Sequence, residues 1–235
     1  MYGLNMQGDD PEGRSKILLL KDRREAGRKL AGLLDAYRGE DVIVYALPRG
    51  GVVLGAEIAR ALGAPLDLII LRKIGHPMNP EYAICAVTEF GPPVCNEEEV
   101  ERVDRSWLRE EITRARTEIQ RRREKYLGTK IQRPPERKTC IIVDDGIATG
   151  LTMMAAIDGL KTLKPKEVIV AIPVIPFGVA QKLKTKVDEL VSLSIEGCFL
   201  GSVSAYYEEF SQVDDLEVIE LLRSVEDRRS EENDQ

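Results

Sequence analysis

Residues 140–152 read Cys140-Ile-Ile-Val-Asp-Asp-Gly-Ile-Ala-Thr-Gly-Leu-Thr152, and this stretch decides the fold. It opens with a short apolar run, which is typical of a strand buried on both faces of a parallel sheet. Two carboxylates, Asp144 and Asp145, follow the strand, and a loop with Gly146 and Gly150 leads into a helix. The stretch therefore predicts a strand–loop–helix unit with polar side chains at the carboxyl end of the strand.

Strand and helix patterns alternate along most of the chain. Short apolar runs predict further strands at residues 42–47, 66–71, 83–88, 168–174 and 189–195. Apolar residues at helical spacing predict helices at residues 23–37, 52–62, 151–163 and 179–184. This alternation predicts an α/β fold in which helices flank a parallel sheet.

Unusual residues follow three of the predicted strands. Pro48-Arg49-Gly50-Gly51 follows the first, Arg72-Lys73 opens a polar loop after the second, and Asp144-Asp145-Gly146 follows the strand at 139–143. Ligands of parallel sheets lie beyond the carboxyl ends of the strands. We therefore expect these three segments to converge on one site.

A long charged segment interrupts the pattern. Residues 97–127 are predicted to form one helix with a solvated charged face and an apolar stripe that contains Trp107. That stripe would form a dimer interface or a lid over the site. A short helix is predicted at 214–222, with Asp214 or Asp215 as its cap. The chain is thus predicted to be one domain, residues 1–225, with a helical insertion and a charged, frayed tail at 226–235.

Composition excludes several classes of protein. The chain has 235 residues, a net charge of −6 and a pI near 5.2, which argues against a general nucleic-acid binder. No apolar stretch is long enough to span a membrane, and residues 1–14 lack the apolar core of an export signal. Four widely spaced cysteines are interpreted as reduced thiols of a cytoplasmic protein. The single histidine, His76, disfavours a His-based zinc site or a Ser-His-Asp triad.

The loop after the acidic pair has the composition of a phosphate site. Gly146 and Gly150 let backbone N–H groups surround an anion, and the following helix adds the positive end of its dipole. Thr149 and Thr152 add hydroxyl donors. The adjacent carboxylates would repel a phosphate, so they are expected to face sugar hydroxyls or Mg²⁺. The segment therefore predicts a site for a 5-phosphorylated ribose.

The stretch CIIVDDGIATG, residues 140–150, resembles the signature of the type I phosphoribosyltransferases. ALPRGGV, residues 46–52, is similar to the pyrophosphate loop of that family, and residues 72–81 lie where the family has a flexible catalytic loop. The resemblance covers residues 42–210 and is closest to an uncharacterised bacterial and archaeal branch. It implies a parallel sheet flanked by helices with a small hood, to which this chain adds the insertion at 97–127.

The resemblance implies that the site binds phosphoribosyl pyrophosphate (PRPP). Asp144 and Asp145 would hold the ribose 2- and 3-hydroxyls. Mg²⁺ would bridge the pyrophosphate and the ribose, and any contact with the two carboxylates would run through water. The 5-phosphate would be bound, largely through backbone N–H groups, by Gly146, Ile147, Ala148, Thr149 and Gly150, with Thr152 beside them.

The resemblance also implies roles at the pyrophosphate end of the substrate. Arg49, Gly50 and Gly51 would bind the pyrophosphate. A non-proline cis peptide bond is expected between Pro48 and Arg49, because the family often has one in this loop.

The implied reaction is Mg²⁺-dependent transfer of the 5-phosphoribosyl group from PRPP to a nitrogenous base with release of pyrophosphate, as in nucleotide salvage. Arg49, Arg72 and Lys73 would be catalytic because they neutralise charge on the departing pyrophosphate. Closure of the 72–81 loop would exclude water. The implied partners are PRPP and a small nitrogenous acceptor, with no nucleic acid or membrane, and a homodimer is left open.

The acceptor stays open. Hypoxanthine-guanine members carry an acidic residue at the position of Ala148. Alanine at this position is found in adenine-type members. Residues 198–210 nevertheless resemble the hypoxanthine-guanine segment in which an aromatic ring stacks on the purine, and Phe199 would be that aromatic residue. A non-catalytic PRPP- or nucleotide-sensing regulator on the same fold is the second hypothesis. The retained Arg49-Gly50-Gly51 favours the enzyme.

Overall fold

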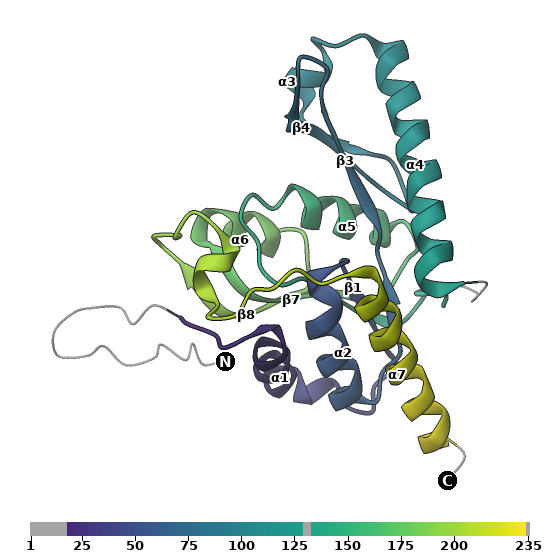
Figure 1. Ribbon diagram of the computed structural model, residues 1–235, viewed down its shortest axis with the longest axis vertical. Coiled ribbons are helices and arrows are strands. Elements are labelled where there is room, and N and C mark those ends of the chain that lie inside the picture. Colours follow the sequence, from purple (N-terminus) through teal and green to yellow (C-terminus); the bar gives the residue numbers. More distant parts are fainter. Residues whose placement is uncertain (1–17, 129–132, 234–235) are drawn as a thin grey trace, which may run out of the picture.

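A five-stranded sheet in the order β2-β1-β6-β7-β8 forms the centre of the molecule (Figure 1). Every neighbouring pair of strands is parallel, so the predicted fold class is confirmed. The computed structural model describes residues 18–128 and 133–233, and the segment at 1–14, predicted to lack an export signal, lies outside them. The strands are β1 (Val42–Ala46), β2 (Leu66–Leu68), β6 (Thr139–Val143), β7 (Glu167–Pro176) and β8 (Glu189–Glu196).

Helices cover both faces of this sheet (Figure 1). One layer contains α1 (Arg23–Leu33), α2 (Gly50–Leu62) and α7 (Asp215–Asn233), and the other contains α5 (Leu151–Lys161) and α6 (Phe177–Lys184). Successive side chains of a strand point to opposite faces. Val42 and Val44 of β1 therefore join the first layer, and Ile43 and Tyr45 join the second. Burial on both faces explains why this strand is apolar throughout.

A second, antiparallel sheet stands beside the first (Figure 1). It consists of β3 (Leu71–His76), β4 (Asn79–Thr88) and β5 (Val94–Cys95). Two predictions are wrong here. Residues 72–81 belong to a hairpin rather than a loop, and the strand at 83–88 pairs antiparallel with β3 instead of joining the parallel sheet. An antiparallel sheet can expose one face to water, so polar residues in a strand do not by themselves indicate a loop.

The charged insertion contains two helices instead of the one predicted. They are α3 (Glu97–Val100) and α4 (Arg105–Leu127). Asp104 separates them, because its Oδ1 accepts hydrogen bonds from the backbone N–H groups of Ser106 and Trp107, each at 2.8 Å. This side chain therefore caps the N-terminus of α4.

The C-terminal helix is longer than predicted. Asp214 caps α7 as expected, since its Oδ1 accepts from the backbone N–H of Glu217 at 2.8 Å. The helix continues to Asn233, so the prediction that the chain frays from residue 226 is wrong for residues 226–233. Two short 3-10 turns, η1 (Asp35–Tyr37) and η2 (Val203–Tyr206), complete the described elements. Within residues 18–128 and 133–233, every helix falls short of the length or hydropathy that a bilayer span requires.

A buried ion network attaches α4 to the main sheet. Nη2 of Arg123 lies 2.9 Å from Oδ1 of Asp67, and its Nη1 lies 2.8 Å from Oε2 of Glu89. Only 12% of the Arg123 side chain is exposed. Oε1 of Glu89 also accepts from the backbone N–H of Ile70 at 2.8 Å, and Arg123 donates to the carbonyl of Leu68 at 3.3 Å. One arginine therefore connects the insertion to β2 and to the end of β4.

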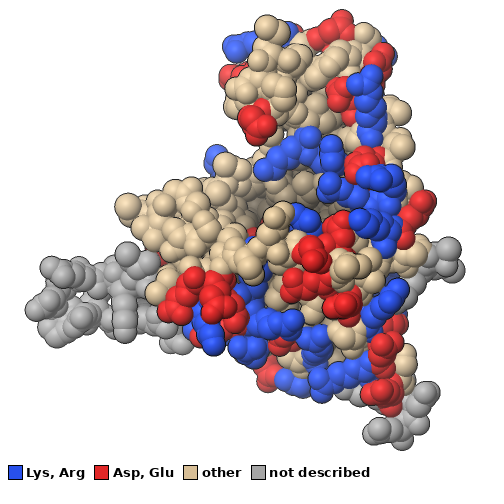
Figure 2. Space-filling model, viewed as in Figure 1, with Lys and Arg blue, Asp and Glu red and all other residues tan. Residues whose placement is uncertain are grey.

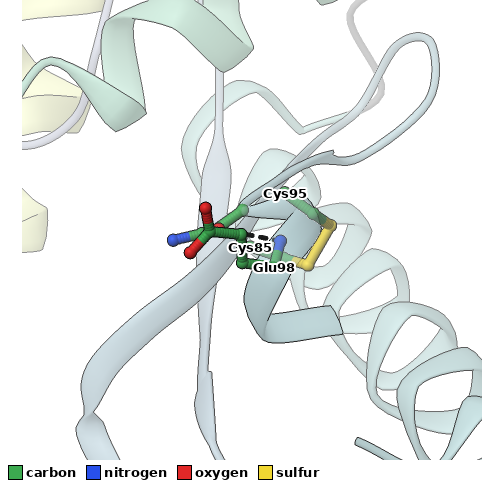
Figure 3. The surroundings of a disulfide bond; sticks show 4 residues. Cys85, Cys95 and Glu98 are labelled. Atoms are coloured by element: carbon green, nitrogen blue, oxygen red, sulfur yellow. Dashed lines mark hydrogen bonds between the residues drawn. A yellow bond between two sulfur atoms is a disulfide. The ribbon is translucent and has the colours of Figure 1, made fainter. Parts of the chain in front are cut away.

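A disulfide joins Cys85 and Cys95, so the prediction of four reduced cysteines is wrong (Figure 3). The two residues are directly paired in the ladder between β4 and β5, with their Cα atoms 4.0 Å apart. This pairing depends on the register of the antiparallel sheet, which spacing along the chain does not reveal. Cys140 and Cys198 are free, the first buried and the second exposed.

Replacing Arg123 by methionine should destabilise the protein by about 3–5 kcal/mol near pH 8, because it leaves two buried carboxylates without their cation. Burial raises the pKa of Glu89 from 4.5 to about 7, although Arg123 opposes the rise. Because folding raises this pKa, protonation of Glu89 stabilises the folded state at a pH below the ordinary carboxyl pKa. This stabilisation is lost as the pH rises through about 7. Loss of Arg123 raises that pKa further, so the destabilisation should be smaller near pH 5. Denaturant unfolding at pH 5 and at pH 8 measures this loss in the free energy of unfolding.

Arg121→Met on the same helix is the control, because its side chain is 76% exposed. We expect it to change the free energy of unfolding by no more than about 0.5 kcal/mol at either pH. Equal losses in the two variants, or an R123M loss that does not vary with pH, would contradict the role of the network.

Thiol labelling in the absence of reductant tests the disulfide. Cys198 should react in the folded protein, whereas Cys140 should react only after unfolding, because burial raises the pKa of its thiol to about 12 and shields it from the reagent. Cys85 and Cys95 should react only after unfolding and reduction. Labelling of more than two thiols in the unfolded, unreduced protein would show that these two cysteines are not paired.

Candidate functional site

The loops after β1 and β6 touch at the carboxyl ends of these neighbouring strands. The backbone N–H of Leu47 donates to the carbonyl of Val143 at 2.9 Å. A Cβ at Gly50 would lie 1.9 Å from Oδ2 of Asp145, and a Cβ at Gly51 would lie 2.7 Å from the Val143 carbonyl oxygen. Only glycine permits so close an approach. The structure therefore brings these two predicted segments together.

The first of these loops contains the expected cis peptide bond, between Pro48 and Arg49. Arg49 occupies the N-cap position of α2, so the N-terminal N–H groups of this helix begin beside Asp145. The Arg49 side chain is 38% exposed, and its Nη1 lies 3.8 Å from Oδ1 of Asp215, the first residue of α7. The loop thus presents a helix N-terminus to the acidic pair and a guanidinium group to the side of α7.

Asp145 is held by a residue that sequence reasoning missed. Nε of Arg23 lies 2.8 Å from Oδ2 of Asp145, and the two side chains are 10% and 17% exposed. Arg23 also donates to the carbonyl of Ser211 at 2.7 Å, and its guanidinium carbon lies 3.7 Å from the ring centroid of Phe210. The hydroxyl of Tyr207 donates to the Asp145 carbonyl at 2.7 Å. No local pattern indicates Arg23, which precedes Asp145 by 122 residues.

Asp144 is the less neutralised of the two carboxylates. Its Oδ1 accepts a hydrogen bond from the backbone N–H of Asp145 at 2.9 Å. Burial, and then the neighbouring Asp145, raise the pKa of Asp144 well above its ordinary value, while the charges of Arg23 and Lys73 act in the opposite direction. A hydroxyl donor or a cation at this position would therefore stabilise the ionised carboxylate.

The segment at 146–150 forms a loop anchored at its centre. The backbone N–H of Ile147 donates to the carbonyl of Val174 at 3.0 Å, and the Ile147 side chain is buried. Ala148 and Thr149 are exposed. Gly150, at a φ of 84°, leads into α5, which begins without a side-chain cap. The first N–H groups of α5 can therefore bind an anion.

The two predicted cations of the hairpin act on different carboxylates. Lys73 acts electrostatically on Asp144, whereas Nη1 of Arg72 lies 4.0 Å from Oε1 of Glu118 on α4. Adjacent residues of a strand point to opposite faces. The structure therefore separates the predicted pair, since the charge of Lys73 acts on Asp144 and Arg72 lies beside the insertion.

The segment that resembles an acceptor site packs against the loop at 146–150. A Cβ at Gly146 would lie 2.5 Å from Cγ1 of Val203. Phe199 is half-buried, and its ring centroid lies 5.4 Å from that of Tyr206. Phe199 thus lies in the segment beside the loop but already packs on another aromatic ring.

A cavity of about 530 Å³ lies beside Arg49. It is bounded on one side by α4, a helix that sequence reasoning treated mainly as a solvated charged face. The sequence left a cover over the site as one alternative for this insertion, and spacing along the chain does not show that α4 lies against the loop at 48–51. The lining residues are Pro48, Arg49, Arg121, Arg122, Lys125, Tyr126 and Asp215.

Curated proteins similar to this chain carry one common description. Two proteins of Mycobacterium tuberculosis are each 36% identical to it over 206 residues: "Putative phosphoribosyl transferase MT0597" (strain CDC 1551 / Oshkosh) and "Putative phosphoribosyl transferase Rv0571c" (strain ATCC 25618 / H37Rv). The matches cover 87% of this chain and 46% of each relative. The chain therefore spans about half the length of these curated relatives.

A solved structure and a family model agree with this description. The crystal structure of TT1426 from Thermus thermophilus is similar to this chain with a TM-score of 0.75 and 38% sequence identity. The similarity covers 88% of this chain and 99% of that one. Residues 19–205 match the family model of the phosphoribosyl transferase domain. Because this match takes in both strand-end loops and most of the chain, the protein belongs to the phosphoribosyl transferase domain family.

Proposed function

We propose that the chain binds PRPP and transfers its 5-phosphoribosyl group to a nitrogenous base, with release of pyrophosphate. The observation that carries this proposal is the direct contact of Gly50 and Gly51 with the acidic pair at the end of β6. Through that contact, the loop at 146–150, the two carboxylates and the N-terminus of α2 follow one another along one edge of the sheet. The 5-phosphate, the ribose hydroxyls and the pyrophosphate follow one another in the same order along PRPP.

Different residues at this edge would bind different parts of PRPP. The loop at 146–150 and the first turn of α5 would bind the 5-phosphate through backbone N–H groups, with Thr149 and Thr152 as hydroxyl donors. Asp144 and Asp145 would accept hydrogen bonds from the ribose hydroxyls. Arg23 keeps Asp145 in place for this task, because its guanidinium group is itself fixed by Ser211 and Phe210.

Charge separation during the reaction explains the cations around the site. Cleavage of the C1–pyrophosphate bond places positive charge on the ribose ring and negative charge on the leaving group. Arg49 and Lys73 would stabilise the leaving group, because fixed cations lower the energy of a transition state in which negative charge develops. Arg72 would add positive charge from beside α4, because its Nη1 lies 4.0 Å from Oε1 of Glu118 on that helix.

Mg²⁺ would be held largely by the substrate. Among residues 18–128 and 133–233, no group of three or more His, Cys, Asp or Glu side chains could hold a metal ion. Mg²⁺ commonly binds one or two carboxylates and completes its shell with water and substrate phosphates. Asp144 and Asp145 would contact the ion through water, and a nearby cation would stabilise the ionised form of Asp144. When bound, the ion would neutralise part of the pyrophosphate charge.

The acceptor is proposed only as a class. Ala148 supplies no acid or base to a purine, and Phe199 already packs on Tyr206. A nitrogenous base agrees with the resemblance, and its identity is left to the experiment. The cytoplasmic location and the homodimer stay predictions from the sequence.

Pyrophosphate release from PRPP, measured with Mg²⁺ across a panel of purine and pyrimidine bases, tests the proposed reaction. We expect release that requires one base, and a loss of about 100-fold or more in the variant Asp144→Asn/Asp145→Asn, because the ribose loses the groups that position it. Circular dichroism shows whether that variant is folded. Tight PRPP binding without release with any base would favour the sensing regulator, and neither binding nor release would overturn the site.

Gly50→Ala tests the contact between the two loops. Its Cβ would overlap Oδ2 of Asp145, so the carboxylate and Arg23 must move, and we expect PRPP binding to weaken by about tenfold or more. Gly32→Ala is the matched control, because a Cβ there meets no atom within 4 Å. Calorimetric titration of both variants with PRPP and Mg²⁺ gives the comparison. Equal affinities in the two variants would show that the contact is not needed for binding.

A further inference from the structure

Three cations of α4 share one cavity with Arg49. The cavity of about 530 Å³ lies where the insertion meets the loop at 48–51, and Arg121, Arg122 and Lys125 line it from the helix side. Figure 2 shows Lys and Arg gathered along α4 beside the hollow between the insertion and the body of the molecule. Four cations from two segments far apart in sequence therefore border one space.

Asp215 is the carboxylate in the lining of this cavity. Its Oδ2 lies 2.5 Å from Nζ of Lys125, and its Oδ1 accepts from the hydroxyl of Tyr126 at 2.6 Å. Its contact with Arg49 is longer, at 3.8 Å. These partners hold the pKa of Asp215 below its ordinary value, the hydrogen bond from Lys125 being the largest cause. Asp215 thus orients Lys125 and leaves Arg49 with a weak partner.

Glu118 binds the two arginines from outside the lining. Its Oε2 lies 2.9 Å from Nε of Arg121, and its Oε1 lies 3.2 Å from Nε of Arg122. One carboxylate therefore binds two guanidinium groups, and Arg121 also donates to it through Nη2 at 3.1 Å. Each guanidinium group keeps N–H donors for a ligand, since an arginine has five.

The position of these cations is set by the buried arginine that lies among them in sequence. Arg123 is attached to Asp67 and Glu89, so it fixes the rotation of α4 about its axis at this turn. With Arg123 directed into the protein, its neighbours Arg121 and Arg122 lie at the cavity. A solvated helix face needs no such anchor.

Arginines elsewhere on α4 have a different setting. Arg114 pairs with Glu111 at 2.7 Å and with Glu110 at 3.7 Å, and Arg109 donates to the Arg105 carbonyl at 3.2 Å. Neither residue lines the cavity. Arg109 and Arg114 therefore form a comparison pair on the same helix, with the same charge as Arg121 and Arg122 but outside the cavity lining.

We propose that this cavity binds an oligophosphate group and that α4 thereby completes the pyrophosphate end of the site. The proposal rests on the proposed function in that the natural group would be the pyrophosphate of PRPP. Guanidinium groups bind phosphate oxygens in pairs of charge-assisted hydrogen bonds, and Lys125 adds a point charge. The lining is mostly charged, so it favours phosphate groups over a base or another apolar moiety. Arg49 links this cavity to the glycine loop that touches Asp145.

Calorimetric titration with inorganic pyrophosphate and Mg²⁺ tests the proposal on the full chain. Arg121→Met/Arg122→Met should weaken binding by about tenfold or more, because several charge-assisted hydrogen bonds are lost. Arg109→Met/Arg114→Met removes the same charge from the same helix and should stay within about twofold. Thermal unfolding confirms that both variants are folded. Equal weakening in the two variants would overturn the proposal, since it would show that the net charge of the protein alone causes the effect.

A variant that should strengthen pyrophosphate binding adds a second test. Glu118→Gln removes the carboxylate that competes for Arg121 and Arg122, so pyrophosphate binding should strengthen by about twofold or more. Arg121→Lys/Arg122→Lys keeps the charge without the planar fork and should fall between the wild type and the methionine variant. Weaker binding in E118Q would contradict a cavity in which these arginines contact the ligand.

The failure of this proposal is distinguishable from the failure of the proposed function. Asp144→Asn/Asp145→Asn should lose PRPP binding but keep the binding of pyrophosphate measured without Mg²⁺, because the cavity lining does not include these carboxylates. Pyrophosphate binding that survives in R121M/R122M, alongside normal transferase activity, would refute only the role of α4. A single-stranded RNA oligomer is the alternative ligand for this run of cations. If R121M/R122M lost RNA binding but bound pyrophosphate as the wild type does, the proposal for α4 would also be overturned.

Discussion

The close contact between the Gly50–Gly51 backbone and the acidic pair after β6 is the constraint on which the candidate site depends. No side chain separates the two loops, and a Cβ at Gly50 would overlap Asp145. The contact brings the N-terminus of α2 to the carboxylates, while the loop at 146–150 leads from them into α5. Two helix N-termini, each with a positive dipole end, therefore lie on either side of two negative charges. Such an edge favours a ligand that carries phosphate at both ends and hydroxyls between them.

Two buried arginines connect segments of this molecule that lie far apart in the sequence. Arg23 joins Asp145 to the segment at 207–211, so the first helix and the C-terminal part of the domain both support one carboxylate. Arg123 joins α4 to β2 and to the end of β4, so the insertion is attached to the same sheet that carries the site. In both cases a planar cation satisfies several acceptors at once, which compensates for its removal from water.

Much of the fold could be predicted because it depends on neighbours in the sequence. The apolar run of β6 indicates burial on both faces, and the glycines after Asp145 indicate a tight loop before a helix. The cis bond at Pro48–Arg49 followed from the family resemblance. The hairpin at 71–88 was missed, because an antiparallel sheet with one face in water does not require apolar strands.

The sequence by itself determined the α/β class, the acidic–glycine loop and the family, since each is written in a continuous stretch of residues. Only the tertiary structure decided which charges meet. Arg23 reaches Asp145 across 122 residues, Cys85 pairs with Cys95 through the register of a hairpin, and α4 turns Arg123 inward beside Arg121 and Arg122. An ion pair or a disulfide depends on distances of a few ångströms between packed elements. Spacing along the chain does not set those distances, because they follow from how the helices and strands pack.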